Sequence, residues 1–179
     1  MKESFSKEKN FFMERYICIH TIMMSLEGVP AFYIHSLFGT ENDYNLYEKT
    51  GRNRSLNRSK IDFDKMNIED ANSKESKIYN KLKQLLLVRR DQTAFHPNAL
   101  QFTLHLGNDL YGVWRQSIDK KQSIFCITNV TEKITKLSLL DINLDDSQRW
   151  HDLIAEGVLE DNISTIELKP YQTVWLSNK

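Results

Sequence analysis

The stretch GVPAFYI, residues 28–34, decides how the first half of this chain is interpreted. It is apolar from Val29 onward almost without alternation. A short, continuous apolar run is typical of a strand that is covered on both faces of a parallel sheet. Gly28 ends a preceding helix and Pro30 prevents its continuation. The sequence therefore predicts a buried parallel β-strand over residues 29–34.

The segments on either side of this stretch have the period of α-helices. Residues 8–27 carry an apolar stripe whose members recur at spacings of three and four: Phe12, Tyr16, Ile19, Met23 and Leu26. Residues 74–90 repeat the pattern with Ile78, Leu82, Leu85 and Leu86, and Ser73 is a suitable N-cap. These patterns predict two amphipathic helices that flank the strand.

A single strand of this kind needs parallel neighbours on both edges, because its backbone groups must be hydrogen-bonded. The chain offers one clear candidate strand of this type. We therefore expect residues 1–98 to be the last part of a larger α/β domain whose earlier strands are absent from this sequence.

The second half of the chain has a different hydrophobic pattern. Short alternating runs replace the helical period, and they cover residues 102–106, 110–116, 123–129, 134–139, 150–154, 163–168 and 173–176. Turn residues separate several of them, at Gly107-Asn108-Asp109, Asp119-Lys120 and Glu160-Asp161-Asn162. Strands at this spacing predict an antiparallel β-sandwich over residues 99–179. The expected fold class is thus α/β plus all-β.

The composition excludes several classes of partner. The chain has 24 basic and 24 acidic residues, so it has no general attraction to nucleic acid or to an anionic membrane. The longest uncharged run, residues 16–26, is shorter than the ~20 residues that span a bilayer. Cys18 and Cys126 lie in apolar runs without metal-ligand spacing, which favours buried free thiols and a cytoplasmic location.

A long polar loop follows the predicted strand. Residues 36–70 show no strong periodicity, and a loop of this length inside a compact domain usually carries function. Its basic side chains gather near its middle, at Arg52, Arg54, Arg58 and Lys60. From the residues alone, the cluster fits either a binding surface or a solvated loop with a few ion pairs.

The motifs in this region resemble a known family. The segments GVPAFYIHSLFGTENDY and KTGRNRSLNR are similar to the eighth strand and following loop of sucrose phosphorylase-like enzymes. Those enzymes belong to the alpha-amylase superfamily, glycoside hydrolase family 13. The ending PYQTVWLSN fits the small β-sandwich of that family. The resemblance implies that residues 1–98 are the last β/α unit of a (β/α)8 TIM barrel and that residues 99–179 form its C-terminal sandwich.

The resemblance also implies a site. Loops at the C-terminal ends of barrel strands build the active site, so residues 35–60 would form one wall of a glucosyl pocket. By similarity, the substrate-binding set is Arg54, Arg58 and Asn57, with His35 and Asp43 as further candidates. Arg52 is the alternative to Arg54, and Asn42-Asp43 is alternatively a turn that holds the loop. We expect Trp114, Trp150 and Trp175 to be core residues.

The expected activity is that of a retaining phosphorylase that passes glucose to inorganic phosphate and releases glucose 1-phosphate. A retaining mechanism needs two carboxyl groups about 5–5.5 Å apart. In the family these groups lie on earlier strands, and neither the Asp62–Asp64 pair nor Glu69-Asp70 fits the role. We therefore expect no catalytic residue, metal or cofactor here, a need for the missing N-terminal barrel portion, and an inactive chain in isolation.

Three questions stay open at this level. The acceptor could be fructose, a phosphorylated fructose, glycerol or glycerate. The chain could also be part of a hydrolase of the same superfamily, or a non-catalytic carbohydrate-binding module.

Overall fold

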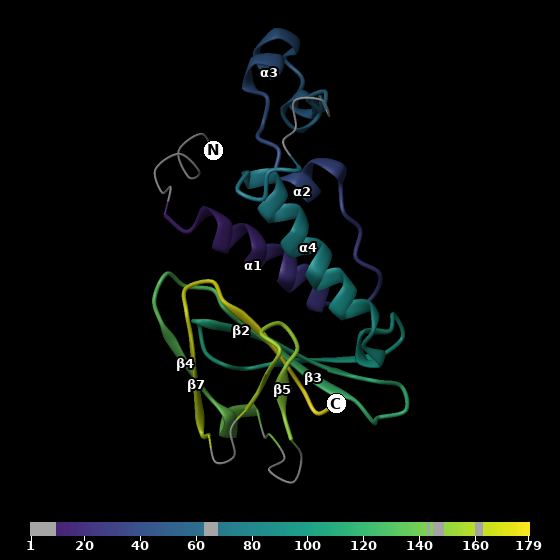
Figure 1. The fold of residues 1–179 in the computed structure, drawn as a ribbon, viewed down its shortest axis with the longest axis vertical. Coiled ribbons are helices and arrows are strands. Elements are labelled where there is room, and N and C mark those ends of the chain that lie inside the picture. The colour runs from purple at the N-terminus through teal and green to yellow at the C-terminus, as the bar shows by residue number, and fades with distance from the viewer. Residues whose placement is uncertain (1–9, 63–67, 143, 145–148, 160–162) are drawn as a thin grey trace. The chain divides into compact units, whose positions relative to one another are not determined.

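The computed structural model describes residues 10–62, 68–142, 144, 149–159 and 163–179. It divides the chain into two compact units (Figure 1). We call the first the sheet unit; it comprises the chain up to Pro30 together with residues 85–179. The second, the helical unit, comprises residues 31–84.

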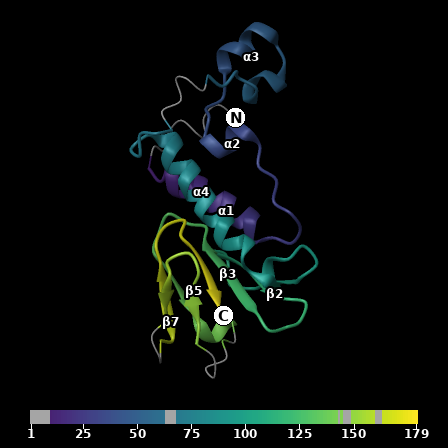
Figure 2. The ribbon, with the colours of Figure 1, turned by 45° about the vertical axis from the view of Figure 1, so that its right-hand side comes forward.

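The sheet unit contains two antiparallel sheets (Figure 2). Six strands pair in the order β1-β2-β3-β8-β5-β6, and β4 pairs with β7 in a second sheet. The strands are β1 Leu100–Leu104, β2 Leu110–Gln116, β3 Ser123–Asn129, β4 Thr135–Ser138, β5 His151–Asp152, β6 Gly157–Val158, β7 Thr165–Leu168 and β8 Thr173–Ser177. The antiparallel architecture expected for the second half of the chain is confirmed.

The alternation of side chains along β2, β3 and β8 explains the two faces of the larger sheet. Phe125, Ile127, Val174 and Leu176 belong to an apolar core shared with the second sheet, which also buries Leu137 and Leu168. The intervening side chains point to the opposite face, since successive side chains of a strand alternate. Val113 pairs with Cys126, and Cys126 with Trp175, in the strand register. All three are buried, so this second face is covered as well.

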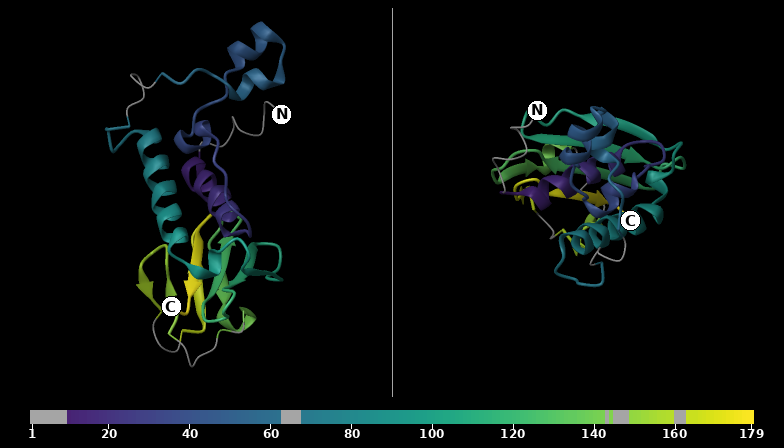
Figure 3. Two further views of the ribbon diagram at one scale, coloured as in Figure 1. Left: turned by 90° about the vertical axis from the view of Figure 1, so that its right-hand side faces the viewer. Right: turned by 90° about the horizontal axis from the view of Figure 1, so that it is seen from above.

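Helix α1, Phe12–Ser25, covers that second face. Its last residue, Ser25, accepts a hydrogen bond from Trp175 Nε1 on β8 at 2.9 Å. Figure 3 shows the C-terminal end of this helix next to the yellow strand β8. The predicted helix over residues 8–27 is confirmed over these shorter bounds, and residues 8 and 9 lie outside the described part of the chain.

The helical unit is built from short elements and the first part of a long helix. These elements are α2 Ile34–Phe38, α3 Tyr44–Thr50, the 3-10 helix η1 Asn53–Asn57, and α4 Lys74–Arg90, which continues into the sheet unit. The bounds of α4 agree with the predicted helix. Phe38 stacks on Tyr79 with ring centroids 5.6 Å apart. Gly39 ends α2 with φ of 60°, in direct contact with Ile78 of α4.

The predicted strand over residues 29–34 is wrong for this structure. The backbone is extended at Tyr33 but joins none of the strand pairs among the described residues, and Ile34 begins helix α2. Val29 is 77% exposed and Tyr33 is 48% exposed. The physical reason is that every strand pair among the described residues is antiparallel and lies in the sheet unit, so no parallel neighbour is available to this segment. The barrel unit, and the division of the chain at residue 98, stay predictions.

Candidate functional site

The polar loop after α2 is folded into a compact turn of helix α3 and the 3-10 helix η1. Asp43 caps α3, because its Oδ1 accepts a hydrogen bond from the Leu46 amide at 2.8 Å. The Asp43 amide donates to the carbonyl oxygen of Leu56 in η1 at 2.7 Å. The hydroxyl oxygens of Thr50 and Ser55 lie 2.6 Å apart and join the two elements a second time. The sequence left two alternatives for Asp43, a contact with substrate or a turn that holds the loop. Its contacts in the structure fit the second alternative.

This turn brings the predicted basic residues together. Arg54 and Asn57 lie in η1, while Arg52 immediately precedes it and Arg58 immediately follows it. All four residues are exposed. Within the described part of the chain, none of the three guanidinium groups makes an ion pair or a hydrogen bond. Each therefore keeps five N–H donors available for a carboxylate, a phosphate or sugar hydroxyls.

His35 lies apart from these arginines in sequence and makes other contacts. It is the second residue of α2, and its ring centroid is 5.1 Å from that of Tyr33. Its Nδ1 is buried and has no hydrogen-bond partner in the structure. An unpartnered buried ring nitrogen is uncommon in folded proteins. This feature is the reason to keep His35 as a candidate within the helical unit.

The sequence also singled out the acidic residues of this region. Asp62, Glu69 and Asp70 are exposed, and Asp70 Oδ1 accepts a hydrogen bond from the Asn72 amide at 2.9 Å. Asp64 lies outside the described residues. Lys74 of α4 bonds Glu41 at 3.0 Å, an exposed contact that ties the loop to the helix. In the part of the chain that the structure describes, no group of three metal-ligating side chains converges.

Two buried arginines of the sheet unit were missed by the sequence reasoning. Arg89 donates from Nε to the Met24 carbonyl at 2.8 Å and from an Nη to the Gly28 carbonyl at 3.0 Å. Arg115 donates to the Ser25 and His96 carbonyls at 3.4 and 3.2 Å. A signal existed, because Arg89 continues the apolar face of α4 and Arg115 lies on the same face of β2 as Val113.

The last carbonyl groups of a helix have no hydrogen-bond partners within the helix. At the C-terminal end of α1 these two guanidinium groups supply the missing donors. The Phe95 ring centroid lies 5.3 Å from the guanidinium carbon of Arg89 and 5.9 Å from that of Arg115. Burial lowers the pKa of both arginines, and the charge of Arg115 lowers that of Arg89 further. The cluster connects the end of α1 to the rest of the sheet unit.

The tryptophans differ in their surroundings. Trp175 is fully buried against Phe95, with ring centroids 4.8 Å apart, and Trp150 is 8% exposed. Trp114 is only partly buried and, with Trp150, lines a groove of about 350 Å³ on the larger sheet. The core interpretation is therefore right for Trp175 and for Trp150, which belongs to the apolar core of the two sheets. Trp114 packs against that core but is only partly buried, and Trp114 and Trp150 also border the groove.

None of the described helices combines the length and the hydropathy that crossing a bilayer requires.

Comparison with curated proteins finds consistent relatives, although the chain matches no protein-family profile. It is 36% identical over 166 residues to a glucosylglycerate phosphorylase of Allomeiothermus silvanus, covering 90% of this chain and 26% of that protein. It is 32% identical over 168 residues to the glucosylglycerate phosphorylase of Escherichia coli, covering 90% and 28%. A third, from Spirochaeta thermophila, is 29% identical over 174 residues, covering 91% and 30%. The chain thus spans less than a third of the length of these relatives.

Solved structures share the fold of almost the whole chain. AmyP in complex with maltose has a TM-score of 0.72 at 15% identity, covering 97% of this chain and 36% of that one. The alpha-amylase of Geobacillus thermoleovorans in complex with acarbose has a TM-score of 0.70 at 14% identity, covering 92% and 33%. At this level of identity the likeness extends to the fold alone.

Proposed function

We propose that the chain belongs to the alpha-amylase superfamily, glycoside hydrolase family 13, and that it is the part of a glucosyl-transferring phosphorylase that carries a pocket loop and the accessory sandwich. The observation that carries this proposal is the similarity to three glucosylglycerate phosphorylases over about nine-tenths of the chain. In this proposal the complete enzyme transfers glucose to inorganic phosphate with retention of configuration. Glucose 1-phosphate is the product, and no cofactor is required.

We propose glucosylglycerate, rather than sucrose, as the substrate of the complete enzyme. The names of the three relatives support this choice. Of the acceptors that the sequence left open, glycerate then becomes the preferred one. Glycerate and phosphate are both anions, and the loop with Arg52, Arg54 and Arg58 offers cationic donors to such groups.

Within this loop, Arg54 is proposed to be the main contact with a sugar hydroxyl or a pocket carboxylate, and Arg52 is its alternative. The exposure of these guanidiniums in the isolated chain supports the proposal, because no described residue occupies their donors. Asn57 is the last residue of η1, and Arg58 follows it directly. His35 is the remaining candidate, and its unpartnered Nδ1 is available for a hydrogen bond. Asp43 is proposed to act by holding α3 against η1.

The partner of this chain in the complete enzyme is proposed to be the barrel portion that carries the catalytic carboxylates. The exposed apolar residues of segment 29–34 support this inference. Ile34 is 40% exposed, and Val29 and Tyr33 are more exposed still, and apolar residues exposed next to one another often mark a contact surface. Two buried free thiols fit a reducing compartment, so a cytoplasmic location is part of the proposal.

The proposal is tested with the chain alone and with a chimera. The 179-residue chain is assayed with glucosylglycerate and phosphate, and no release of glucose 1-phosphate is expected. This chain then replaces the matching segment of the E. coli relative, and the chimera is expected to release glucose 1-phosphate from glucosylglycerate. Activity with sucrose instead, or release of free glucose without phosphate, would contradict the proposed substrate or reaction.

In the active chimera, Arg54→Ala is compared with Arg58→Ala and Lys60→Ala. Removing a guanidinium that pairs with a buried carboxylate costs about 3–5 kcal/mol, which lowers catalytic efficiency by roughly a hundredfold or more. A solvated arginine would cost about 0–1 kcal/mol. Arg52→Ala is measured as well, and if it alone loses activity, then Arg52 and not Arg54 is the pocket arginine. If all four variants keep full activity, the loop does not contribute to the active site.

A further inference from the structure

The groove on the sheet unit is a candidate binding site that lies on the sandwich and contains no part of the basic loop. We call it the aromatic groove. It has a volume of about 350 Å³, and its lining residues are Leu104, Trp114, Gln116, Lys120, Ser123, Phe125, Asp141, Ile142, Trp150 and Asn178. Pockets for small molecules usually have volumes of about 300–1,000 Å³, so this one suits one or two sugar rings.

The wall of the aromatic groove is a continuous row of aromatic rings. Trp114 and Phe125 are stacked with centroids 5.7 Å apart, and Phe125 and Trp150 are tilted at 5.3 Å. They come from β2, from its neighbour β3, and from the chain just before β5, which β8 separates from β3 in the sheet. Phe125 and Trp150 are almost fully buried, so Trp114 is the ring of this row that offers an apolar surface on which the C–H face of a pyranose ring packs.

The rim of the groove is polar, and several of its groups are not used by the protein. In the described residues, Gln116, Lys120 and Asp141 make no side-chain hydrogen bond or ion pair. Trp114 Nε1 is also buried without a partner, although a buried indole N–H usually has one. Gln116, Lys120 and Asp141 therefore offer free donors and acceptors beside an apolar wall.

The turn that presents Lys120 is held firmly. Ser117 Oγ donates to Asp119 Oδ1 at 2.6 Å, and the Lys121 amide donates to the same oxygen at 3.1 Å. The Gln122 amide in turn donates to Ser117 Oγ at 2.9 Å. These bonds lower the pKa of the Asp119 carboxyl. A turn fixed before binding loses little conformational entropy when a ligand arrives.

The chemistry of the rim selects the class of ligand. One lysine and one aspartate oppose each other in charge, so an anion such as phosphate gains no net attraction. A purely apolar ligand would desolvate the rim without satisfying its hydrogen bonds. A neutral polyol with one apolar face satisfies both requirements. We propose that the aromatic groove binds a neutral glucoside ring, as an auxiliary sugar site on the sandwich.

The test uses the 179-residue chain and maltose as a neutral glucoside probe, with inorganic phosphate as the comparison ligand. Saturation-transfer NMR is expected to show contact with maltose and none with phosphate. Gln116→Ala and Lys120→Gly are each expected to weaken maltose binding about three- to tenfold, as loss of one hydrogen bond does. Lys120 has φ of 58°, so glycine removes its side chain without backbone strain.

Glu156→Gly is the matched control, because Glu156 is also exposed, has φ of 56° and does not line the groove. It is expected to leave maltose binding unchanged. As a second measurement, maltose should slow chemical acetylation of Lys120 but not of Lys133. Absence of saturation transfer, equal binding by the wild type and both groove variants, or preferred binding of phosphate would overturn the proposal. Since binding is tested without turnover, its failure is distinct from failure of the proposed phosphorylase function.

Discussion

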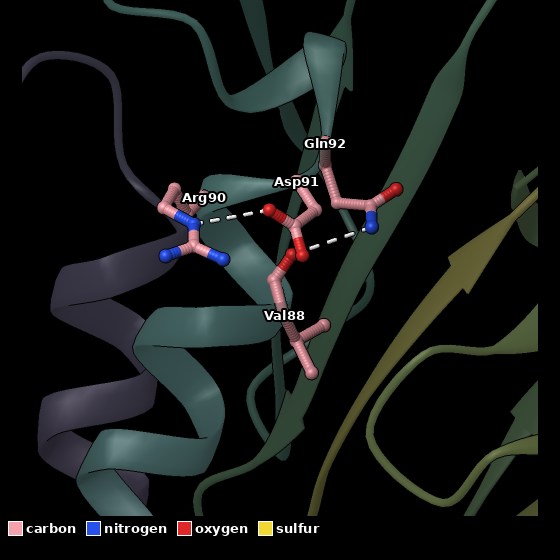
Figure 4. Close-up of polar contacts among 4 residues, drawn as sticks. All are labelled: Val88, Arg90, Asp91 and Gln92. Carbon is pink, nitrogen blue, oxygen red and sulfur yellow. Dashed lines mark hydrogen bonds and ion pairs between the residues drawn. The ribbon is translucent and has the colours of Figure 1, made fainter.

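Replacing Arg89 by methionine should destabilise the sheet unit strongly, whereas the same change at the neighbouring Arg90 should not. Arg89 is 9% exposed and donates to two carbonyls at the end of α1, Met24 O and Gly28 O. Arg90 is exposed, with 70% side-chain exposure, and pairs only with the adjacent Asp91 at 3.0 Å (Figure 4). Comparing the two variants therefore distinguishes the loss of buried hydrogen bonds at Arg89 from the loss of an arginine as such, for which Arg90 is the control.

The magnitude follows from these contacts. A hydrogen bond to a charged group contributes about 1.5–3 kcal/mol, and Arg89→Met leaves two carbonyls without their donor. Part of this loss is offset, because the variant no longer buries a cation beside Arg115, and methionine keeps most of the apolar volume. The expected net loss is about 2–4 kcal/mol. For Arg90→Met it is under about 1 kcal/mol, as for other exposed ion pairs.

The assay is urea unfolding followed by tryptophan fluorescence, to which Trp175 contributes from beside the Arg89 cluster. With an m-value of about 1–3 kcal/mol/M, the midpoint of Arg89→Met should fall by roughly 1–2 M, and that of Arg90→Met should barely move. Equal shifts in the two variants, or a more stable Arg89→Met, would refute the inference that these hydrogen bonds hold α1 to the sheet.

Two other features give direct predictions. Burial raises the pKa of Cys126 from 9.0 to about 12, so the free energy of unfolding should fall as pH rises from about 9 because the unfolded thiol ionises first. Cys126→Ala should show a smaller fall in urea titrations across this range, and an unchanged slope would contradict the burial. Gly39 and Gly51 both have positive φ, but an added Cβ meets a side-chain atom only at Gly39, on Ile78. Gly39→Ala should therefore lower the melting temperature more than Gly51→Ala, which carries only about 1 kcal/mol of backbone strain; equal losses would mean that Ile78 moves aside freely.

Much of the local structure could be predicted from residue patterns. Helix α4 and strands β2 and β3 have the predicted bounds, because a period near 3.6 or 2 places apolar side chains on one face of the element that it specifies. The short strand β6 was not predicted. With two exposed residues, it has no periodic signal to detect.

The candidate site was predictable only as a cluster of residue types. The motif grouped Arg52, Arg54, Asn57 and Arg58, and the structure places them on and beside one short helix. It does not bring His35 into contact with them, and it shows that Asp43 caps α3. Such roles depend on which backbone amides a side chain meets after folding, and that information is absent from a residue pattern.

By itself, the sequence determined the helical periods, the antiparallel character of the second half and the position of the basic loop, because each depends on neighbours within a few residues. Only the tertiary structure decided that residues 29–34 do not form a strand, that Arg89 and Arg115 end α1, and that Trp114 and Trp150 line a groove. The physical reason is that these outcomes depend on partners far away in the chain. A strand needs another strand to hydrogen-bond its backbone, and a side chain on a sheet is buried only on a face that another element covers.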